Sequence, residues 1–303
     1  MTSLKHEFCS LNRLSYDIGV VYNGLTDLFP GLTDKRVSEM QYCVKEGRYT
    51  LSPLIISTFT DKSEIEKEQF VHIITSEDSD NCNEYHGIKP TEEDGLVLLA
   101  LGRMLNLHFL DIDIFVKNSY GLKLPIPKYY DMVCKRGNNV LMFYKIDLTN
   151  SCWIISRESI LCKLSDIVMD KKIIELVKKF LYSPIVDTSG QEYLTNIMIP
   201  SAELITSVLL NLALMEFDKE FQQVFPELEY SRYVHQVFVS ITNAEIKQRM
   251  PLDIFEDKVR RLFDKLNVTG KILSIVPGEG PVRCYRGEVS VSQDGEIKVK
   301  YDV

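Results

Sequence analysis

The sequence predicts an α+β fold, in which helices alternate with short, mostly antiparallel strands. Three observations carry this prediction. Helical apolar spacing recurs over 37–44, 173–181 and 252–266, apolar strand-like runs recur over 140–146 and 233–241, and 288–301 alternates as a hairpin. Such mixing of helices with antiparallel hairpins, without an internal repeat, is typical of α+β domains.

The first predicted elements are a helix, a short strand and a second helix. The helix over 37–44 ends near Gly47, a suitable C-cap because glycine adopts positive φ without steric cost. A short strand over 70–74 lies between acidic, polar segments that we expect to be solvated loops. Thr91 then suits the N-cap of a helix, and the acidic residues 92–94 favour its positive dipole end.

The second half of the chain adds six predicted elements. The apolar run 140–146 predicts a strand that ends at Asp147. The others are a helix over 173–181, a long buried helix over 204–221, a strand over 233–241, a helix over 252–266, and a hairpin over 288–301 that turns at Asp294 and Gly295.

Composition is ordinary for a globular protein, but the charge is unusual for one that tracks nucleic acid. The chain has 303 residues, 45% hydrophobic and 26% charged, which is enough to bury a sizeable core. Its net charge is −8. Because phosphate neutralisation supplies much of the affinity for nucleic acid, this balance disfavours a broad RNA-binding groove while leaving room for a local basic patch.

The seven cysteines favour free thiols in a reducing compartment, because their number is odd and no Cys-x-x-Cys occurs. A disulfide framework or a zinc site is the alternative. The start of the chain shows no secretory signal and no clearly arginine-rich transit peptide. The longest apolar window, 197–217, contains Glu203 and Glu216, so we expect a buried helix, no membrane span and a soluble protein.

One short motif carries the strongest functional signal. Arg232-Tyr233-Val234-His235-Gln236 stands immediately before an apolar strand. It resembles the Arg-Tyr-Ala-Asp-Asp motif of the group II intron-encoded reverse transcriptase and maturase family, organellar type. In that family the two aspartates hold catalytic magnesium. Here a histidine and a glutamine stand in their place.

Further blocks resemble the same family in the same order. They are Gly47 to Pro53, Gly87 to Asp94, Phe115 to Lys123, Lys145 to Leu148 with Trp153 to Arg157, and Met198 to Ala202 with the helix that follows. The resemblance implies a right-hand polymerase fold without a thumb. It implies a fingers-like region over 1–135 and a palm-like region over 136–303, joined in one contiguous reverse-transcriptase-like unit.

The resemblance also indicates which chemistry is lost. Nucleotide addition uses two metal ions, and magnesium prefers carboxylate oxygens as ligands. Asp147 occupies the position of the first palm aspartate, so the degenerate site consists of Asp147, His235 and Gln236. We predict no catalytic residue, no metal and no cofactor here. Asp147 is interpreted as an acid that caps the turn after its strand, with a residual metal site as the alternative.

Two other ligand-contacting regions differ from the family. The arginine and lysine that grip the triphosphate there fall on Glu84 and near Thr75 here, and Glu84 would repel phosphate. The Gly-Ile-Pro-Gln-Gly turn has lost its glycines and glutamine in 198–202. Asn211, Asp218 and the apolar faces persist, although random decay would also have placed costly polar groups in the core. This pattern indicates a fold kept for a use other than polymerisation.

Weaker candidates have plainer interpretations. Tyr42, Tyr129 and Tyr130 could stack on bases, but core or rim positions are the favoured interpretation. The basic run 258–261 is interpreted as a solvated helix face rather than an RNA contact. Gly278 to Pro281 is interpreted as a turn, because no Gly-Lys-Ser/Thr follows it.

We therefore predict a pseudoenzyme derived from an RNA-directed DNA polymerase, acting as a structural or RNA- or protein-binding component of a larger assembly. A ribonucleoprotein or a ribosome is the expected host, with RNA binding left open. The alternative is an intron-splicing maturase without polymerase activity, which the missing thumb and the acidic charge disfavour. The family resemblance implies an organelle, with an organelle-encoded chain, and favours a mitochondrion over a plastid.

Overall fold

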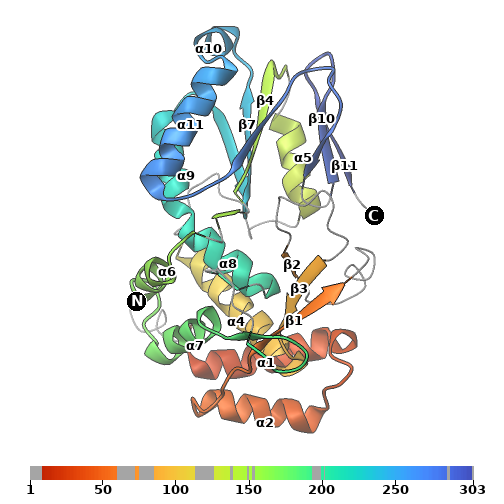
Figure 1. The fold of residues 1–303 in the computed structure, drawn as a ribbon, viewed down its shortest axis with the longest axis vertical. Coiled ribbons are helices and arrows are strands. Elements are labelled where there is room, and N and C mark those ends of the chain that lie inside the picture. Colours follow the sequence, from red (N-terminus) through yellow and green to blue (C-terminus); the bar gives the residue numbers. More distant parts are fainter. Residues whose placement is uncertain are drawn as a thin grey trace. The chain divides into compact units, whose positions relative to one another are not determined.

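The computed structural model describes residues 9–59, 72–74, 85–112, 126–136, 139–148, 150–151, 154–192, 199–200, 202–284 and 287–301. The chain divides into two compact units, and Figure 1 labels most of their elements. Unit 1 comprises Met1–Ile112 and Ser156–Leu209, and unit 2 comprises Asp113–Ile155 and Leu210–Val303.

The two units are defined by packing, whereas the predicted regions 1–135 and 136–303 are defined by the family resemblance, so the units do not test that division. Each unit is built from two stretches of chain, because the segment after Ile155 packs with the N-terminal helices before the chain enters unit 2 again. The fingers-like label for 1–135 and the palm-like label for 136–303 therefore remain a prediction about ancestry rather than a description of the packing.

Unit 1 combines helices with a small mixed sheet. Its helices are α1 (Leu11–Gly24), the 3₁₀ turn η2 (Thr26–Leu28), α2 (Asp34–Lys45), α4 (Glu92–Asp111), α6 (Arg157–Ser165), α7 (Lys171–Leu181) and the first part of α8 (Glu203–Ala213). The sheet order is β2-β3-β1-β5, formed by β1 (Leu54–Phe59), β2 (His72–Ile74), β3 (Tyr85–Lys89) and β5 (Ile185–Val186). β1 pairs antiparallel with β3 and parallel with β5.

Side-chain caps determine where these helices begin. Ser10, Thr33, Thr91, Ser156 and Asp170 each accept a hydrogen bond from a backbone N–H in the first turn of the following helix. Each cap satisfies a donor that would otherwise lack a helical partner, an effect of about 1 kcal/mol. The prediction that Thr91 caps a helix is confirmed, with three acidic residues in the first turn of α4.

Unit 2 is built on a four-stranded antiparallel sheet of order β6-β7-β4-β8. Its strands are β4 (Met142–Asp147), β6 (Glu229–Tyr233), β7 (Gln236–Ile241) and β8 (Lys271–Ile275). The helix α9 (Met215–Val224) precedes β6, and α10 (Ala244–Arg249) and α11 (Leu252–Leu266) lie between β7 and β8. Apart from the excursion into unit 1, this is the βαββαβ succession of ferredoxin-like folds.

Helices α9 and α11 cover one face of this sheet. The Tyr144 ring of β4 stacks on Phe255 of α11 with 4.0 Å between centroids. Phe221 of α9 lies 4.7 Å from the Tyr230 ring of β6. Both helices have one apolar side, and burying that side against the sheet provides most of the stability of such helices.

The opposite face of the same sheet is covered by α5 (Ile126–Arg136) and a second, three-stranded sheet. That sheet has the order β11-β10-β9 and consists of β9 (Val282–Cys284), β10 (Gly287–Val291) and β11 (Ile297–Tyr301). Figure 1 shows α5 between β4 and β10, away from α9 and α11. The shared core contains Tyr129, Tyr130, Val133, Val140, Phe143, Phe238, Ile275, Cys284, Val289, Val291 and Ile297.

Most predicted elements are confirmed. The structure has helices at 37–44, 173–181 and 252–266, a strand that ends at Asp147, and a terminal hairpin that pairs Val289 with Val299. Gly47 and Gly295 both have positive φ, at 70° and 81°. The strand predicted over 70–74 is present at 72–74, and its first two residues lie outside the described residues.

Two predicted elements were wrong in their extent. The strand predicted over 233–241 is a hairpin, because Val234 and His235 form a two-residue turn between β6 and β7. The helix predicted over 204–221 is interrupted at Leu214, where α8 ends and α9 begins. Apolar periodicity continued across both positions and so concealed the breaks.

Two further expectations concern cysteines and membranes. Cys9, Cys43, Cys134, Cys162 and Cys284 are free thiols, while Cys82 and Cys152 lie outside the described residues. Within the described ranges, no helix combines the length and the apolar character needed to cross a membrane.

Candidate functional site

The structure brings the three residues of the predicted degenerate site together in unit 2. Asp147 ends β4, and its Cα pairs with that of Gln236 at the start of β7. The Leu148 amide donates a hydrogen bond of 2.7 Å to the His235 carbonyl. Residues nearly ninety positions apart in the chain therefore meet at one end of the sheet, as the motif resemblance predicted.

Asp147 has a cation beside it. Lys145 lies two residues earlier on β4, so its side chain is on the same face, and its Nζ is 3.3 Å from Asp147 Oδ2. Lys145 is nearly buried, and its Nζ also donates to the Arg283 carbonyl at 2.7 Å. The aspartate is therefore held in an ion pair; the capping role that we predicted for it remains a prediction.

This donor set does not fit a pair of divalent ions. Asp147 supplies one carboxylate, while Gln236 is a neutral amide with 4% of its surface exposed. Over the part of the chain that the structure describes, no three His, Cys, Asp or Glu side chains are grouped so that they could hold a metal ion. Magnesium prefers several hard oxygen ligands and gives up its bound water reluctantly, so this arrangement offers little to bind it.

The turn between β6 and β7 has an unusual backbone. Val234 has a φ of 51° although its side chain is β-branched and buried. A β-branched residue in this region is a genuine outlier, and such a conformation costs of order 1–3 kcal/mol. Surrounding contacts must therefore hold the turn, and both Arg232 and the Leu148 amide donate to its carbonyl groups.

Arg232 is buried completely and forms the centre of a polar network. Its Nε and Nη2 donate to the two carboxylate oxygens of Asp218 at 2.6 and 2.5 Å. Its Nη1 donates to Asn211 Oδ1 at 2.7 Å and to the Val234 carbonyl at 2.5 Å. The Tyr230 hydroxyl also donates to Asp218. The guanidinium thus joins α8 and α9 to the strained turn.

The charges in this network stabilise each other. Burial alone would lower the pKa of Arg232, but the Asp218 carboxylate more than compensates and raises it above the usual value. Burial, followed by the negative charge of Asp218, raises the pKa of Tyr230 well above its ordinary range. Arg232, Asn211 and Asp218 are positions at which the sequence matches the predicted family resemblance, and their common contact gives a physical reason for their presence together.

The sheet face that carries Gln236 is covered by the two tyrosines of α5. The Tyr129 ring lies over Phe238, and its hydroxyl is 3.1 Å from Ser231 Oγ. The Tyr130 hydroxyl reaches Gln236 Oε1 at 3.5 Å. Burial raises the pKa of Tyr130, and a contact with the Cys284 thiol adds to this. Both tyrosines belong to the core, which confirms the plainer interpretation of that pair.

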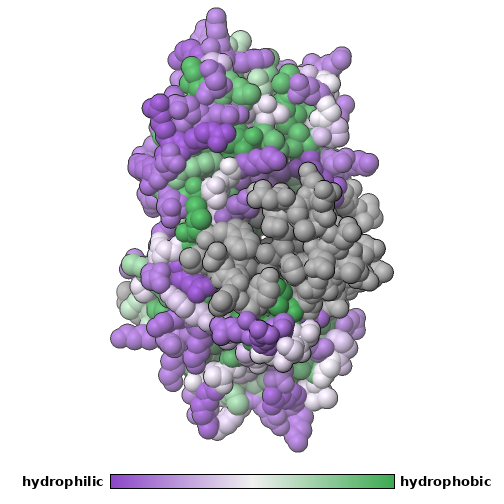
Figure 2. Space-filling view, viewed as in Figure 1, coloured by the Kyte–Doolittle hydropathy of each residue, from purple (hydrophilic) through white to green (hydrophobic). Residues whose placement is uncertain are grey.

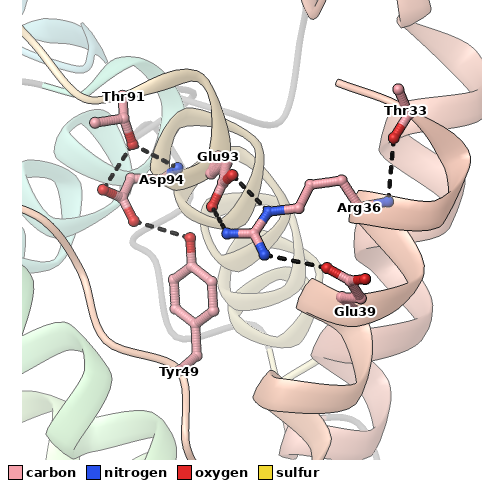
Figure 3. Close-up of polar contacts among 7 residues, drawn as sticks. All are labelled: Thr33, Arg36, Glu39, Tyr49, Thr91, Glu93 and Asp94. Carbon is pink, nitrogen blue, oxygen red and sulfur yellow. Dashed lines mark hydrogen bonds and ion pairs between the residues drawn. The ribbon is translucent and has the colours of Figure 1, made fainter. Parts of the chain in front are cut away.

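The fingers-like blocks at 47–53 and 87–94 also meet, in unit 1. Asp94 is buried and accepts hydrogen bonds from the Tyr49 hydroxyl at 2.9 Å, the Ser52 amide at 3.0 Å and the Thr91 hydroxyl at 2.8 Å. Figure 3 shows the contacts of Asp94 with Tyr49 and Thr91 beside a second cluster, in which Arg36 joins Glu93 and Glu39. The Tyr49–Asp94 contact therefore serves the packing of this unit.

Several predicted residues lie outside the described residues. They are Thr75, Glu84, Phe115 to Lys123, Trp153, Met198 and Ser201. Of the described candidates, Arg260 and Arg261 are exposed and pair with Glu256 and Asp257 along α11, which supports a solvated face. Gly278 lies in a turn closed by a hydrogen bond from the Glu279 amide to the Val276 carbonyl.

Sequence reasoning missed two features of the site. The ion pair between Lys145 and Asp147 could have been found from their spacing, because alternate residues of a strand share a face. The cover formed by α5 and β9–β11 gave no local signal, since its apolar residues are separated in sequence from the strands that they cover.

Comparison with known proteins identifies structural relatives only. No family model and no curated protein matches the chain. Apo telomerase from Candida tropicalis aligns with 95% of this chain and 66% of its own, at 10% identity and a TM-score of 0.52. A form of it truncated from the C-terminal domain aligns with 86% of this chain and covers 59% of its own length, at 12% identity and a TM-score of 0.50. Candida albicans telomerase, in complex with a TWJ fragment of telomeric RNA, aligns with 80% of this chain and covers 48% of its own length, at 12% identity and a TM-score of 0.49.

The chain has a reverse-transcriptase-like fold. At these identities the likeness shows the fold alone, and the chain spans between 48% and 66% of the length of these telomerase chains. The narrower resemblance to the group II intron family remains a prediction from the sequence motifs.

Proposed function

We propose that this chain is a catalytically inactive reverse-transcriptase-like protein that serves as a structural or binding component of a larger assembly. One observation carries the proposal. Asp147, at the position of the first predicted palm aspartate, is opposed by the amide of Gln236 and paired with the ammonium group of Lys145.

The charge balance at this position argues against two-metal chemistry. The Asp147 carboxylate and the Lys145 ammonium sum to zero formal charge. Two divalent ions would bring four positive charges and need converging carboxylates to offset them. His235 is neutral or cationic and Gln236 is neutral, so neither residue supplies that charge.

The packing in unit 2 favours a scaffold role. In a working polymerase the sheet face beside the catalytic acids must stay accessible to primer and nucleotide. Here Tyr129 and Tyr130 pack on the face that carries Phe238 and Gln236. The same contacts make a continuous core with the terminal sheet, so the covering layer contributes to folding.

The wider setting follows from the sequence resemblance. Fingers-like and palm-like regions are part of this proposal. The assembly is an RNA–protein or protein complex in an organelle, a mitochondrion ahead of a plastid. Its location and its members rest on the resemblance to group II intron proteins.

Primer extension tests the catalytic part. The purified chain is incubated with an RNA template, a DNA primer, nucleotides and Mg²⁺ or Mn²⁺, beside an active reverse transcriptase. We expect no extension. The matched control is Asp147→Asn, because extension that requires Asp147 would overturn the proposal, whereas product that persists in this variant comes from a contaminant.

Purification from the native source tests the assembly. We expect the chain to co-purify with a particle of many components, in which protein and RNA are identified together. Recovery as an isolated monomer would contradict an assembly role. Recovery with one unspliced intron RNA would instead favour the splicing maturase.

A further inference from the structure

Two tyrosines stand exposed on one face of the helix pair α1 and α2. Tyr16 and Tyr42 are 64% and 58% exposed, which is high for aromatic residues. Ser15 Oγ donates to the Gln41 carbonyl at 2.9 Å, and Gln41 Nε2 donates back to the Ser15 carbonyl at 2.8 Å. In antiparallel helices, the residues that follow a facing pair turn to the same side, so both rings lie on one surface.

Each ring has an arginine beside it. The Arg13 guanidinium carbon lies 5.8 Å from the Tyr16 ring centroid, and that of Arg48 lies 5.4 Å from the Tyr42 centroid. Arg48 Nη2 also donates to the Tyr42 hydroxyl at 3.2 Å. These contacts orient both rings and bring cationic donors close to them.

Two lysines extend this cationic surface. A Cβ atom placed on Gly47, next to Arg48, would lie 3.2 Å from Lys172 Nζ, so that ammonium group sits beside the end of α2. Lys45 is exposed one helical turn after Tyr42. We name the resulting surface the tyrosine–arginine strip and define it as Arg13, Tyr16, Tyr42, Lys45, Arg48 and Lys172.

Acidic neighbours neutralise the strip only in part. Arg13 pairs at 3.0 Å with the buried Asp17, and Arg48 is 3.8 Å from Glu46 with both side chains exposed. Exposed pairs of the second kind are worth 1 kcal/mol at most and yield readily to another anion. Asp170, which accepts from the Lys172 and Leu11 amides, is a third acid beside the strip. The four cations of the strip therefore exceed these three acids by one, in a chain whose net charge is −8.

We propose that the tyrosine–arginine strip binds single-stranded RNA. Bases would stack on the two exposed rings, and phosphates would contact the arginines and lysines beside them. The paired rings favour RNA over an acidic peptide, which needs cations but no aromatic platform. In the face shown in Figure 2, the surface over α2 is mostly hydrophilic to intermediate, which suits a polar ligand. This inference deepens the proposed function by naming a partner and its site.

The chain supplies its own control for this proposal. Tyr182 is 44% exposed, and Arg157 lies 4.9 Å from its ring centroid. Its hydroxyl, however, donates to the Glu158 carboxylate, which would repel phosphate. Tyr182 follows α7 at the end opposite Lys172, about 15 Å away along the helix. A ligand bound at the strip therefore has no need of Tyr182.

Fluorescence anisotropy with a labelled 12-nucleotide RNA of mixed A and U tests the inference. We expect Tyr16→Ala/Tyr42→Ala to weaken binding by about tenfold or more, and Tyr182→Ala to leave it unchanged. The logarithm of the RNA association constant should fall linearly with the logarithm of the salt concentration. We expect the double variant Arg48→Gln/Lys172→Gln to make this slope shallower by about 1.4, since each phosphate contact on a single strand contributes about 0.7. Circular dichroism melting checks that each variant remains folded.

Three outcomes would overturn the inference. They are no binding by the unmodified chain at micromolar concentration, equal binding by the tyrosine double variant, and binding of a polyglutamate peptide in place of RNA. None of them alters the primer-extension result, so failure of the strip is distinguishable from failure of the inactive-enzyme proposal.

Discussion

Replacing Asp218 with asparagine removes one charge from the buried network around Arg232 while keeping the shape of the side chain. Both residues are fully buried, with 0% of each side chain exposed. Arg232 would then carry an uncompensated charge in the core. Breaking a buried pair in this way costs about 3–5 kcal/mol, a large part of the 5–15 kcal/mol that stabilises an ordinary domain.

The network also predicts that the loss is not additive. Arg232→Met leaves the Asp218 carboxylate without its cation, and we expect a similar cost of about 3–5 kcal/mol. The double variant has no buried charge left, although the Val234 carbonyl and Asn211 Oδ1 each lose a donor, at about 1–3 kcal/mol. The double variant should therefore lose roughly 2–6 kcal/mol, against roughly 6–10 for the two single losses added together, which is a coupling free energy of about 4 kcal/mol.

Urea denaturation followed by circular dichroism and tyrosine fluorescence measures these quantities. In thermal melts followed by circular dichroism, each single variant should lower the melting temperature by roughly 10–20 °C. A loss below about 1 kcal/mol for Asp218→Asn would refute the reasoning, as would effects of the two substitutions that add within about 0.5 kcal/mol. Either result would mean that Arg232 and Asp218 are solvated or have other partners.

Three further predictions concern other parts of the chain. Gly102→Ala should destabilise the protein by about 1–3 kcal/mol in urea, because its Cβ would lie 2.8 Å from the backbone of α8, whereas Gly24→Ala, with open space around it, should be neutral or slightly stabilising. Asn267→Gly should add a few tenths of a kcal/mol and Asn267→Ala should cost about 1, because this C-cap residue has a φ of 50°. In mass-spectrometric mapping at pH 8, iodoacetamide should label the exposed Cys162 well before Cys9, because burial, and then the charge of a nearby aspartate, raises the pKa of the Cys9 thiol to about 12. Equal labelling rates, or equal effects of the two glycine variants, would contradict these expectations.

Much of the fold was predictable from local signals. The helices over 173–181 and 252–266 have strong apolar periodicity, and the terminal hairpin has alternating valines with an Asp-Gly turn, so neighbouring residues alone define them. The meeting of Asp147 with Gln236 was predictable from a motif resemblance, because that resemblance carries the long-range pairing of an entire fold. The turn at Val234 and His235 was not predictable in this way, because Val234 continues the apolar pattern of the strand.

By itself, the sequence determined where most helices and strands form and which carboxylates the predicted catalytic position lacks, because both depend on residue identity and short spacing. Only the tertiary structure decided that Arg232, Asp218 and Asn211 form one buried network, that α5 covers the face beside Gln236, and that Tyr42 is exposed while Tyr129 and Tyr130 are buried. Those facts depend on contacts between segments far apart in the chain. Burial is a property of the whole fold, and no short stretch of sequence specifies it.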